Sequence, residues 1–291
     1  MAEATRIDGS GWHAGRVTTT QQATAGDARQ ALSWGLVPAS GVSVSAFLMF
    51  GLQHQPSAYV VLVVSVVGAF LVDRDLGKSL ALIGFGIGII GLISLEADIS
   101  YANIVLMGSV LITAVVIPYV VDRFILRRHV IRFPVNTGRR WTRAERWYLV
   151  IVVGLAWMIM PFYFIRSGTY LNWPAVRELS ESTRLFLGVN AVGLWDELFF
   201  ICAVFALLRR HFPLWQANLL QAVIFVSFLW ELGYQSWGPL LTFPFALVQG
   251  YIFNRTRSLP YVVCTHLIFD CVLFLVLLHA HNPGWLPIFV Y

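Results

Sequence analysis

Apolar residues occur along this chain in long runs that are separated by short polar breaks. A helix needs about 20 predominantly apolar residues to cross the roughly 30 Å hydrocarbon core of a bilayer. Nine runs approach that length, although the eighth is short and contains Pro244. The pattern therefore predicts an all-α polytopic membrane protein with eight or nine transmembrane helices. The predicted spans are 32–52, 57–72, 79–95, 102–121, 147–165, 184–208, 217–235, 239–253 and 259–280.

The composition supports a membrane protein and excludes two other classes. Hydrophobic residues fill 58% of the 291 positions, and Asp, Glu, Lys and Arg fill only 12%. An ordinary soluble domain carries about twice that share of charge. So apolar a chain is neither disordered nor a nucleic-acid-binding protein, despite its net charge of +5. We therefore expect a lipid bilayer around the protein and no nucleic-acid partner.

Basic residues predict the orientation in the membrane. Lys and Arg concentrate on the cytoplasmic side of membrane proteins, and the connector 122–146 is the most arginine-rich part of the chain. If this connector is cytoplasmic, alternating spans place all but three of the 20 Lys and Arg on the same side. The exceptions are Arg166, Arg177 and Arg184. We therefore expect a multi-pass cell-membrane protein with a cytoplasmic N-terminus and its C-terminus outside.

Ionisable residues inside the apolar runs are confined to the last four predicted spans. They are Asp196, Glu197, Glu231, His266 and Asp270. A charged side chain at mid-membrane costs on the order of 3 kcal/mol, so each is a candidate functional residue. His266 and Asp270 are four residues apart and should share one helix face. The side chains of adjacent Asp196 and Glu197 should point about 100° apart on a helix. One can then face the centre of the bundle while the other braces a neighbouring helix.

This uneven distribution predicts how the chain is organised. Residues 1–30 are polar and lack the apolar core of a cleavable signal peptide. We expect them to form a cytoplasmic tail, which leaves the first hydrophobic helix as the insertion signal. Residues 31–183 should form an accessory transmembrane region of about five spans. Residues 184–291 should form a four-helix core of catalytic type.

Four carboxylates and one imidazole would repel one another strongly in a low-dielectric core. Either several carboxylates are protonated, or a metal cation neutralises them. A carboxylate-rich site with one imidazole suits Mn or Fe better than a typical zinc site. The same side chains could instead serve only as hydrogen-bonding contacts between helices.

The segment 195–232, WDELFFICAVFALLRRHFPLWQANLLQAVIFVSFLWEL, resembles the CPBP family of intramembrane proteases. This is the CAAX-protease and bacteriocin-processing family, also called ABI. Its members carry Glu-Glu-x-x-x-Arg on one helix, Phe-x-x-x-His on the next, and His-x-x-x-Asn or His-x-x-x-Asp on a last one. The resemblance covers roughly 190–280 in the right order and spacing. The matching positions here are Asp196, Glu197 and Ile201, then Ser227 and Glu231, then His266 and Asp270.

The resemblance implies an intramembrane metalloendopeptidase that cleaves a membrane-associated or prenyl-type peptide. Glutamate and histidine, with or without a divalent metal such as Zn, Mn or Fe, would activate the water. The implied catalytic residues are Glu197 as base, His266 and Asp270 at the oxyanion or metal, Glu231 as a second base or ligand, and Asp196 in support. The implied metal ligands are Glu197, Glu231, His266 and Asp270.

Two departures from the family pattern leave alternatives open. Ile201 replaces the motif arginine that would pair a glutamate, and Glu231 replaces the second-motif histidine. The protein could therefore be a catalytically degenerate scaffold or regulator of the same fold. It could also hold a carboxylate-rich Mn, Fe or other cation site with a non-proteolytic function. An ion-coupled transporter is disfavoured, because the two halves show no inverted repeat.

Overall fold

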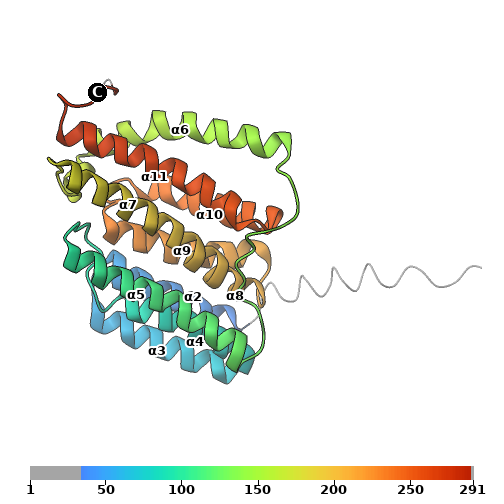
Figure 1. Ribbon diagram of the computed structural model, residues 1–291. Coiled ribbons are helices and arrows are strands. Elements are labelled where there is room, and N and C mark those ends of the chain that lie inside the picture. Colours follow the sequence, from blue (N-terminus) through green and yellow to red (C-terminus); the bar gives the residue numbers. More distant parts are fainter. Residues whose placement is uncertain (1–33, 290–291) are drawn as a thin grey trace, which may run out of the picture. The chain divides into compact units, whose positions relative to one another are not determined.

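The computed structural model describes residues 34–289, so the predicted tail, residues 1–30, lies outside the described residues. Within 34–289 the chain forms nine helical segments, one short 3-10 turn and no β-strand (Figure 1). The predicted all-α polytopic fold is confirmed. The segments are α2 (Leu36–Ala46) with η1 (Phe47–Gly51), α3 (Gln55–Val72), α4 (Arg74–Ile90), α5 (Tyr101–Val120) with η2 (Val121–Ile125), α6 (Arg143–Ser167), α7 (Leu179–Asp196) with η4 (Glu197–Phe205) and α8 (Ala206–Arg209), α9 (Leu214–Leu232), α10 (Pro239–Thr256) and α11 (Leu259–His281); the 3-10 turn is η3 (Thr169–Asn172).

Each predicted apolar run coincides with one helical segment, with ends that differ by a few residues. Five segments are long and apolar enough to cross a membrane: α3, α5 with η2, α6, α7 through α8, and α11. The remaining four are shorter or more polar. In α9 the polar residues Gln216, Asn218, Gln221 and Glu231 are all buried within the protein, so this helix directs its polar groups to neighbouring helices.

Local sequence signals define several helix ends. Thr142 and Glu145 form a capping box that satisfies free N–H groups at the start of α6. Gly168 ends α6 with φ +74°, a left-handed conformation that glycine adopts without strain. Asp73 caps α4 by accepting a hydrogen bond from the Leu76 N–H at 2.7 Å. Pro244 lies inside α10, which continues as one helix to Thr256.

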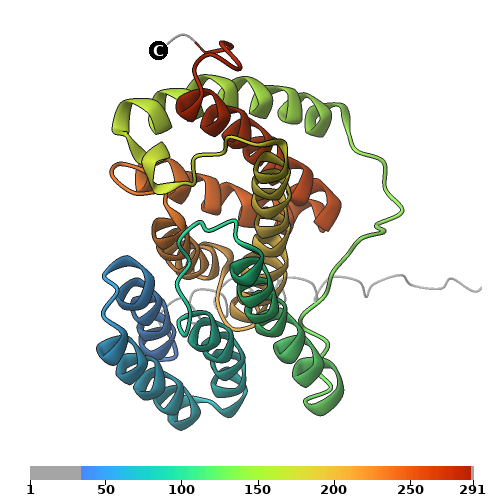
Figure 2. The same cartoon turned by 60° about the vertical axis from the view of Figure 1, so that its left-hand side comes forward.

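The segment α7–η4–α8 runs through the middle of the helical bundle, with α6 and α3 at opposite edges (Figures 1 and 2). Its α7 part packs against α11, and its η4 part packs against α5 and α9. Trp195 ties it to α5, because its Nε1–H donates to the carbonyl of Leu111 at 2.6 Å. Trp195 also stacks on Phe199, with ring centroids 5.0 Å apart. The predicted accessory helices therefore contact the helix that carries two of the predicted site residues.

The loops of the described chain gather at two ends of the bundle. The connector 126–142 runs along one end from α5 to α6 (Figure 1), and we call this the connector end. It is fastened to α11 by a hydrogen bond from the Leu259 N–H to the Pro134 carbonyl at 3.1 Å. The loops 91–100, 168–178 and 233–238 join the opposite ends of their helices. We call that end the cavity end, because both cavities described below include its residues.

Candidate functional site

Four of the five predicted site residues meet around the imidazole of His266. Its Nδ1 lies 2.8 Å from Oε1 of Glu197. Its Nε2 lies 3.7 Å from Oδ2 of Asp196 and 3.9 Å from Oδ1 of Asp270. All four residues are buried, with at most 5% of each exposed. The structure thus places three carboxylates around a single imidazole at the interface of α7, η4 and α11.

The backbone changes from α-helix to π-helix between Asp196 and Glu197. Asp196 is the last residue of α7, and Glu197 begins the nine-residue π-helical segment η4. Such stretches are frequent at functional sites. The two neighbouring carboxylates approach different nitrogens of the His266 ring. Both therefore face the site, whereas the sequence predicts that one of them braces a neighbouring helix.

Gln249 of α10 supplies the partner that Glu197 lacks within its own helix. Ile201, at the position of the motif arginine, is fully buried among apolar residues. The Gln249 Nε2–H₂ group donates to Glu197 Oε1 at 2.7 Å and to the Val262 carbonyl at 3.1 Å. One amide therefore connects α10, η4 and α11. Nothing in the sequence identifies Gln249 as the partner of Glu197.

Several buried polar atoms at this site have no protein partner. Asp196 Oδ1, Glu197 Oε2 and Asp270 Oδ2 are each buried without a hydrogen-bond partner among the described residues. Buried polar groups are normally satisfied, so three such oxygens in one cluster need an explanation. They give the site unused capacity to accept hydrogen bonds from water or from a ligand.

Glu231 is placed elsewhere. It lies near the C-terminal end of α9, and its Oε1 accepts a hydrogen bond from the Leu95 N–H at 3.4 Å. No hydrogen bond or ion pair within residues 34–289 joins it to His266. The structure therefore brings together Asp196, Glu197, His266 and Asp270, and leaves Glu231 against the loop between α4 and α5.

The donors do not fit the four-ligand metal set that the resemblance implies. That set includes Glu231, which is held by the loop around Leu95. His266 Nδ1 is already engaged by Glu197. Over residues 34–289 no group of three or more His, Cys, Asp or Glu side chains has an arrangement that could hold a metal ion. Metal binding therefore stays a prediction, and we derive no chemical step through a metal.

Two cavities reach the cluster from different sides. One, of about 260 Å³, lies mainly between α5 and α7; the other, of about 200 Å³, lies between α6 and α10. We call them the α5/α7 cavity and the α6/α10 cavity. His266, Asp270, Leu229 and Tyr234 line both of them. Ligand sites are typically apolar hollows with a few convergent polar groups, and both cavities have this character.

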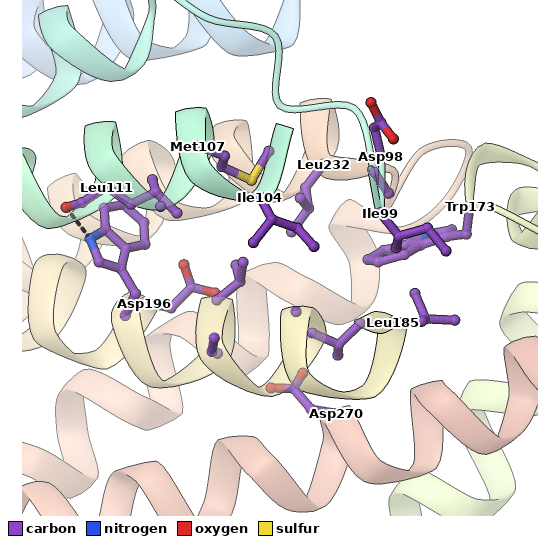
Figure 3. A pocket seen from close by; sticks show the side chains of 18 of the residues that line it. Asp98, Ile99, Ile104, Met107, Leu111, Trp173, Leu185, Asp196, Leu232 and Asp270 are labelled. Atoms are coloured by element: carbon purple, nitrogen blue, oxygen red, sulfur yellow. Dashed lines mark hydrogen bonds between the residues drawn. The ribbon is translucent and has the colours of Figure 1, made fainter. Parts of the chain in front are cut away.

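In the α5/α7 cavity, apolar side chains of α5 lie opposite Asp196 and Asp270, and Asp98 lines the cavity from the loop before α5 (Figure 3). Asp196 and Asp270 line it from α7 and α11, whereas α5 contributes Ile104 and Met107. Gly193 lies where α7 approaches α11, because a Cβ at this position would collide with the Asp270 carboxylate. Any side chain larger than hydrogen at 193 would displace Asp270.

Comparison with known proteins finds one family model that is similar to part of the chain. The model of the family described as type II CAAX prenyl endopeptidase Rce1-like matches residues 178–272. The match covers about a third of the chain, from the start of α7 to just beyond Asp270. It confirms, over these residues, the resemblance that the sequence motifs predict. No curated protein and no solved structure matches the chain significantly.

Proposed function

From the Rce1-like match of residues 178–272 and the cluster around His266, we propose that the protein is a membrane-embedded peptidase. The observation that carries this proposal is the contact of Glu197 with both His266 and Gln249 at hydrogen-bonding distance. The motif arginine is absent, yet the glutamate still has a fixed orientation. Its second oxygen is buried without a hydrogen-bond partner within residues 34–289, and Glu197 itself lines neither cavity, so the proposal requires water to reach this oxygen from the cavities beside His266.

In the proposed reaction Glu197 acts as the general base. Its Oε1 is held by Gln249 and His266, and its Oε2 takes a proton from a water molecule. The water oxygen then bonds to the peptide carbonyl carbon. When the C–N bond breaks, the proton on Glu197 passes to the leaving amine. General acid–base catalysis of this kind contributes about 10²–10⁴-fold to the rate.

His266 is the proposed donor to the oxyanion. As an imidazolium it donates through Nδ1 to Glu197, which leaves the Nε2–H for the oxyanion, and His266 lines both cavities. Asp196 and Asp270, 3.7 and 3.9 Å from Nε2, flank this donor and stabilise its positive charge. Preorganised donors in a water-poor site are among the largest contributions to catalysis.

The proposed substrate is a membrane-associated peptide, with prenyl-type peptides as the class that the family description suggests. Both cavities are lined mainly by apolar side chains and include residues of the cavity end. If the arginine-rich connector is cytoplasmic, the cavity end faces the outside of the cell. The orientation therefore decides which peptides can reach the site.

Cysteine labelling tests this orientation. Ser180 is exposed at the cavity end and Asn136 is exposed in the connector. In a background in which exposed Cys271 is replaced by Ser, we expect a membrane-impermeant maleimide to label Ser180→Cys on intact cells and Asn136→Cys only after lysis. The reverse pattern would place the cavities on the cytoplasmic side.

A cleavage assay tests the proposed activity. Protein in lipid nanodiscs would be incubated with a membrane-peptide library that includes prenylated members, beside Glu197→Gln and His266→Ala variants. We expect products that depend on both residues. If wild type and both variants leave every peptide intact, the scaffold alternative is favoured, since Glu231 replaces the second-motif histidine and makes no hydrogen bond or ion pair with His266 within residues 34–289.

A further inference from the structure

The proposed reaction does not use Tyr234, although this residue borders the site. It lies in the loop between α9 and α10 and lines both cavities, together with His266 and Asp270. Its side chain is partly buried, and its hydroxyl makes no hydrogen bond within the described chain. The hydroxyl lies within electrostatic range of the carboxylates of Asp270 and Asp196. Buried tyrosine hydroxyls usually have a hydrogen-bond partner, so an unpaired one beside the site is a candidate for function.

The backbone at Tyr234 is held in place by the neighbouring loop. Gly233 has φ +127°, a conformation that L side chains rarely adopt, and a Cβ at this position would collide with the Trp173 indole. The Tyr234 N–H donates to the Leu229 carbonyl at 2.9 Å. The Asn172 Nδ2–H₂ group donates to the Gly233 carbonyl at 3.2 Å. These contacts fix the point from which the Tyr234 side chain extends.

Two aromatic rings fix the orientation of the Tyr234 side chain. Its ring centroid lies 5.5 Å from that of Phe164 in α6 and 5.9 Å from that of Trp173 in the loop before α7. Both neighbours pack edge to face, at interplanar angles of 72° and 87°. These apolar contacts hold the ring without engaging its hydroxyl. Such a donor can meet developing charge without reorganising, which is the property that electrostatic catalysis requires.

We propose that Tyr234 is a second donor to the oxyanion, beside His266, and thus a further catalytic residue. When the water oxygen bonds to the peptide carbonyl carbon, the carbonyl oxygen becomes negative and accepts hydrogen bonds from the Tyr234 hydroxyl and from His266 Nε2–H. The phenol keeps its proton throughout, since a tyrosine ordinarily loses it only near pH 10. When the C–N bond breaks, the carbonyl re-forms and the proton on Glu197 passes to the leaving amine. This assignment rests on the proposed peptidase function.

The assignment fits the way in which this chain departs from the family motif. Glu231 replaces the second-motif histidine, and it makes no hydrogen bond or ion pair with His266 within residues 34–289. Tyr234 follows it by three residues and lies at both cavities. A phenol is neutral, so it adds a donor without adding charge to a cluster that already holds three carboxylates.

Tyr234→Phe tests the hydroxyl alone, because the ring and its edge-to-face contacts remain. With protein in lipid nanodiscs, kcat and KM would be measured on the library peptide that the wild type cleaves fastest. We expect kcat to fall by about a hundredfold, as when one oxyanion donor is removed from other hydrolases. We expect little change in KM, since the donor is needed in the transition state and not in the bound substrate. The melting temperature should stay close to that of the wild type.

Tyr163→Phe is the matched control in the same aromatic group. The Tyr163 hydroxyl donates to the Gln235 carbonyl at 2.5 Å, next to Tyr234, and Tyr163 lines the α6/α10 cavity. This variant should lose stability and keep kcat near the wild-type value. An equal fall in kcat for both variants would overturn the proposal, because displacement of the loop would then explain the loss.

The remaining outcomes separate this proposal from the peptidase itself. If the wild type cleaves, Glu197→Gln does not, and Tyr234→Phe keeps its kcat, then the peptidase stands and the role of Tyr234 is rejected. A rise in KM alone would also reject this role, since Tyr234 would then bind the substrate without stabilising the oxyanion. If the wild type cleaves no peptide, the peptidase is rejected and the role of Tyr234 is rejected with it.

Discussion

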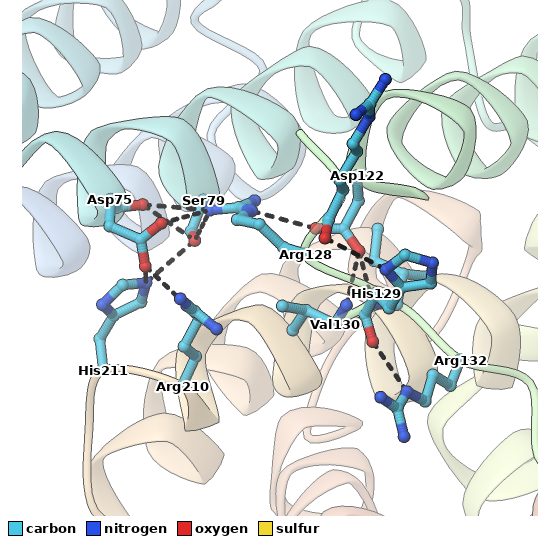
Figure 4. A network of polar contacts seen from close by, with 11 residues as sticks. Asp75, Ser79, Asp122, Arg128, His129, Val130, Arg132, Arg210 and His211 are labelled. Atoms are coloured by element: carbon cyan, nitrogen blue, oxygen red, sulfur yellow. Dashed lines mark hydrogen bonds and ion pairs between the residues drawn. The ribbon is translucent and has the colours of Figure 1, made fainter. Parts of the chain in front are cut away.

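The protein contains two polar clusters, one buried around His266 and one partly exposed around Arg128, and they differ in how fully their charges are satisfied. The cluster at the connector end surrounds Arg128 (Figure 4). Arg128 lies 3.2 Å from carboxylate oxygens of both Asp75 and Asp122, and Arg210 pairs with Asp75 at 2.6 Å. Asp122 is completely buried, and it also accepts the backbone N–H groups of Val130 and Ile131. Here acids and bases balance and each carboxylate has several donors, although Arg128 Nη2 is buried without a partner within residues 34–289.

The cluster around His266 has the opposite character. Three carboxylates share one imidazole and one amide donor, and each carboxylate keeps one buried oxygen without a partner. Cavities reach this cluster, whereas the Arg128 cluster joins the connector to α4 and to the loop after α8. A polar network in which every group is hydrogen-bonded stabilises one structure. A network with unpaired buried groups lowers the stability of the protein, and we expect it to be retained where it serves a function. This contrast fits a stabilising role for the Arg128 cluster and supports the catalytic role that we propose for the His266 cluster.

Replacing Glu197 by Gln should give the largest effect. The change keeps the size of the side chain but removes the base, so we expect cleavage to fall by about a thousandfold, equivalent to about 4 kcal/mol in the barrier. Thermal stability should stay the same or rise, because one of three crowded carboxylates is neutralised. Rates and melting temperatures in the same nanodiscs measure both effects.

Glu231→Gln sharpens this result, because the family resemblance assigns Glu231 to the same site, whereas its carboxylate accepts from the Leu95 N–H and makes no hydrogen bond or ion pair with His266 within residues 34–289. We expect a far smaller loss of rate than for Glu197→Gln. Equal losses in the two variants would return Glu231 to the catalytic group and contradict the geometry described above.

Asp122→Ala should show the reverse pattern, with lost stability and retained activity per folded molecule. Removing one partner leaves the Arg128 guanidinium buried with less compensation, and breaking such a pair costs about 3 kcal/mol or more. Exposed Arg127→Ala is the control in the same connector, and it should change stability little. The measurement is unfolding in detergent beside cleavage by the folded fraction. Unchanged stability in Asp122→Ala would refute the structural role of this cluster.

Gln249→Leu should lower kcat by about tenfold, or about 1.4 kcal/mol, with little change in KM. The reason is that Gln249 orients Glu197 but does not line either cavity. Asn218→Leu is a matched control, because this buried amide bonds the Leu247 carbonyl of the same helix α10 at 2.7 Å. It should lose stability without the kcat effect. A similar fall in kcat for both variants would reduce Gln249 to a packing role.

Most of the fold was predictable, because an apolar run of about 20 residues has few alternatives to a membrane helix. His266, Asp270, Asp196 and Glu197 were predictable for a related reason. An ionisable residue deep in an apolar run is costly, so its presence demands a local partner. Glu231 satisfied the same criterion but lies one residue from the end of α9. Near a helix end other loops can supply a partner, and Leu95 does so.

The rest depended on contacts between residues far apart in sequence. Arg128 is one of several arginines in the connector. The sequence does not indicate which of them has a buried side chain that pairs with Asp122 and Asp75. In the sequence Gln249 resembles any other amide in an apolar run. Its hydrogen bond to Glu197 becomes evident only when α10 is placed beside η4. Arg184 reads as a residue of an outer loop, and only the packing of α5 on α7 places it in a cavity. The sequence signals polarity, whereas the packing decides which polar groups meet.

The smallest expected effect concerns His211, which belongs to the satisfied cluster through a 2.9 Å contact of its Nε2 with the Ser79 hydroxyl. Burial lowers the pKa of His211 below its ordinary value, and Asp75 only partly opposes this. The unfolded chain therefore takes up a proton near pH 6.5 while the folded protein does not. His211 thus contributes stability above about pH 6.5, and this contribution is lost as the pH falls toward the lowered folded pKa. We expect the melting temperature of His211→Gln to fall less than that of the wild type between pH 7.5 and 5.5. The difference corresponds to under about 1 kcal/mol in the free energy of unfolding. Any titration of the His266 cluster is common to both proteins and cancels in the comparison. If the melting temperatures of the two proteins fall equally with pH, His211 does not stay neutral in the folded state.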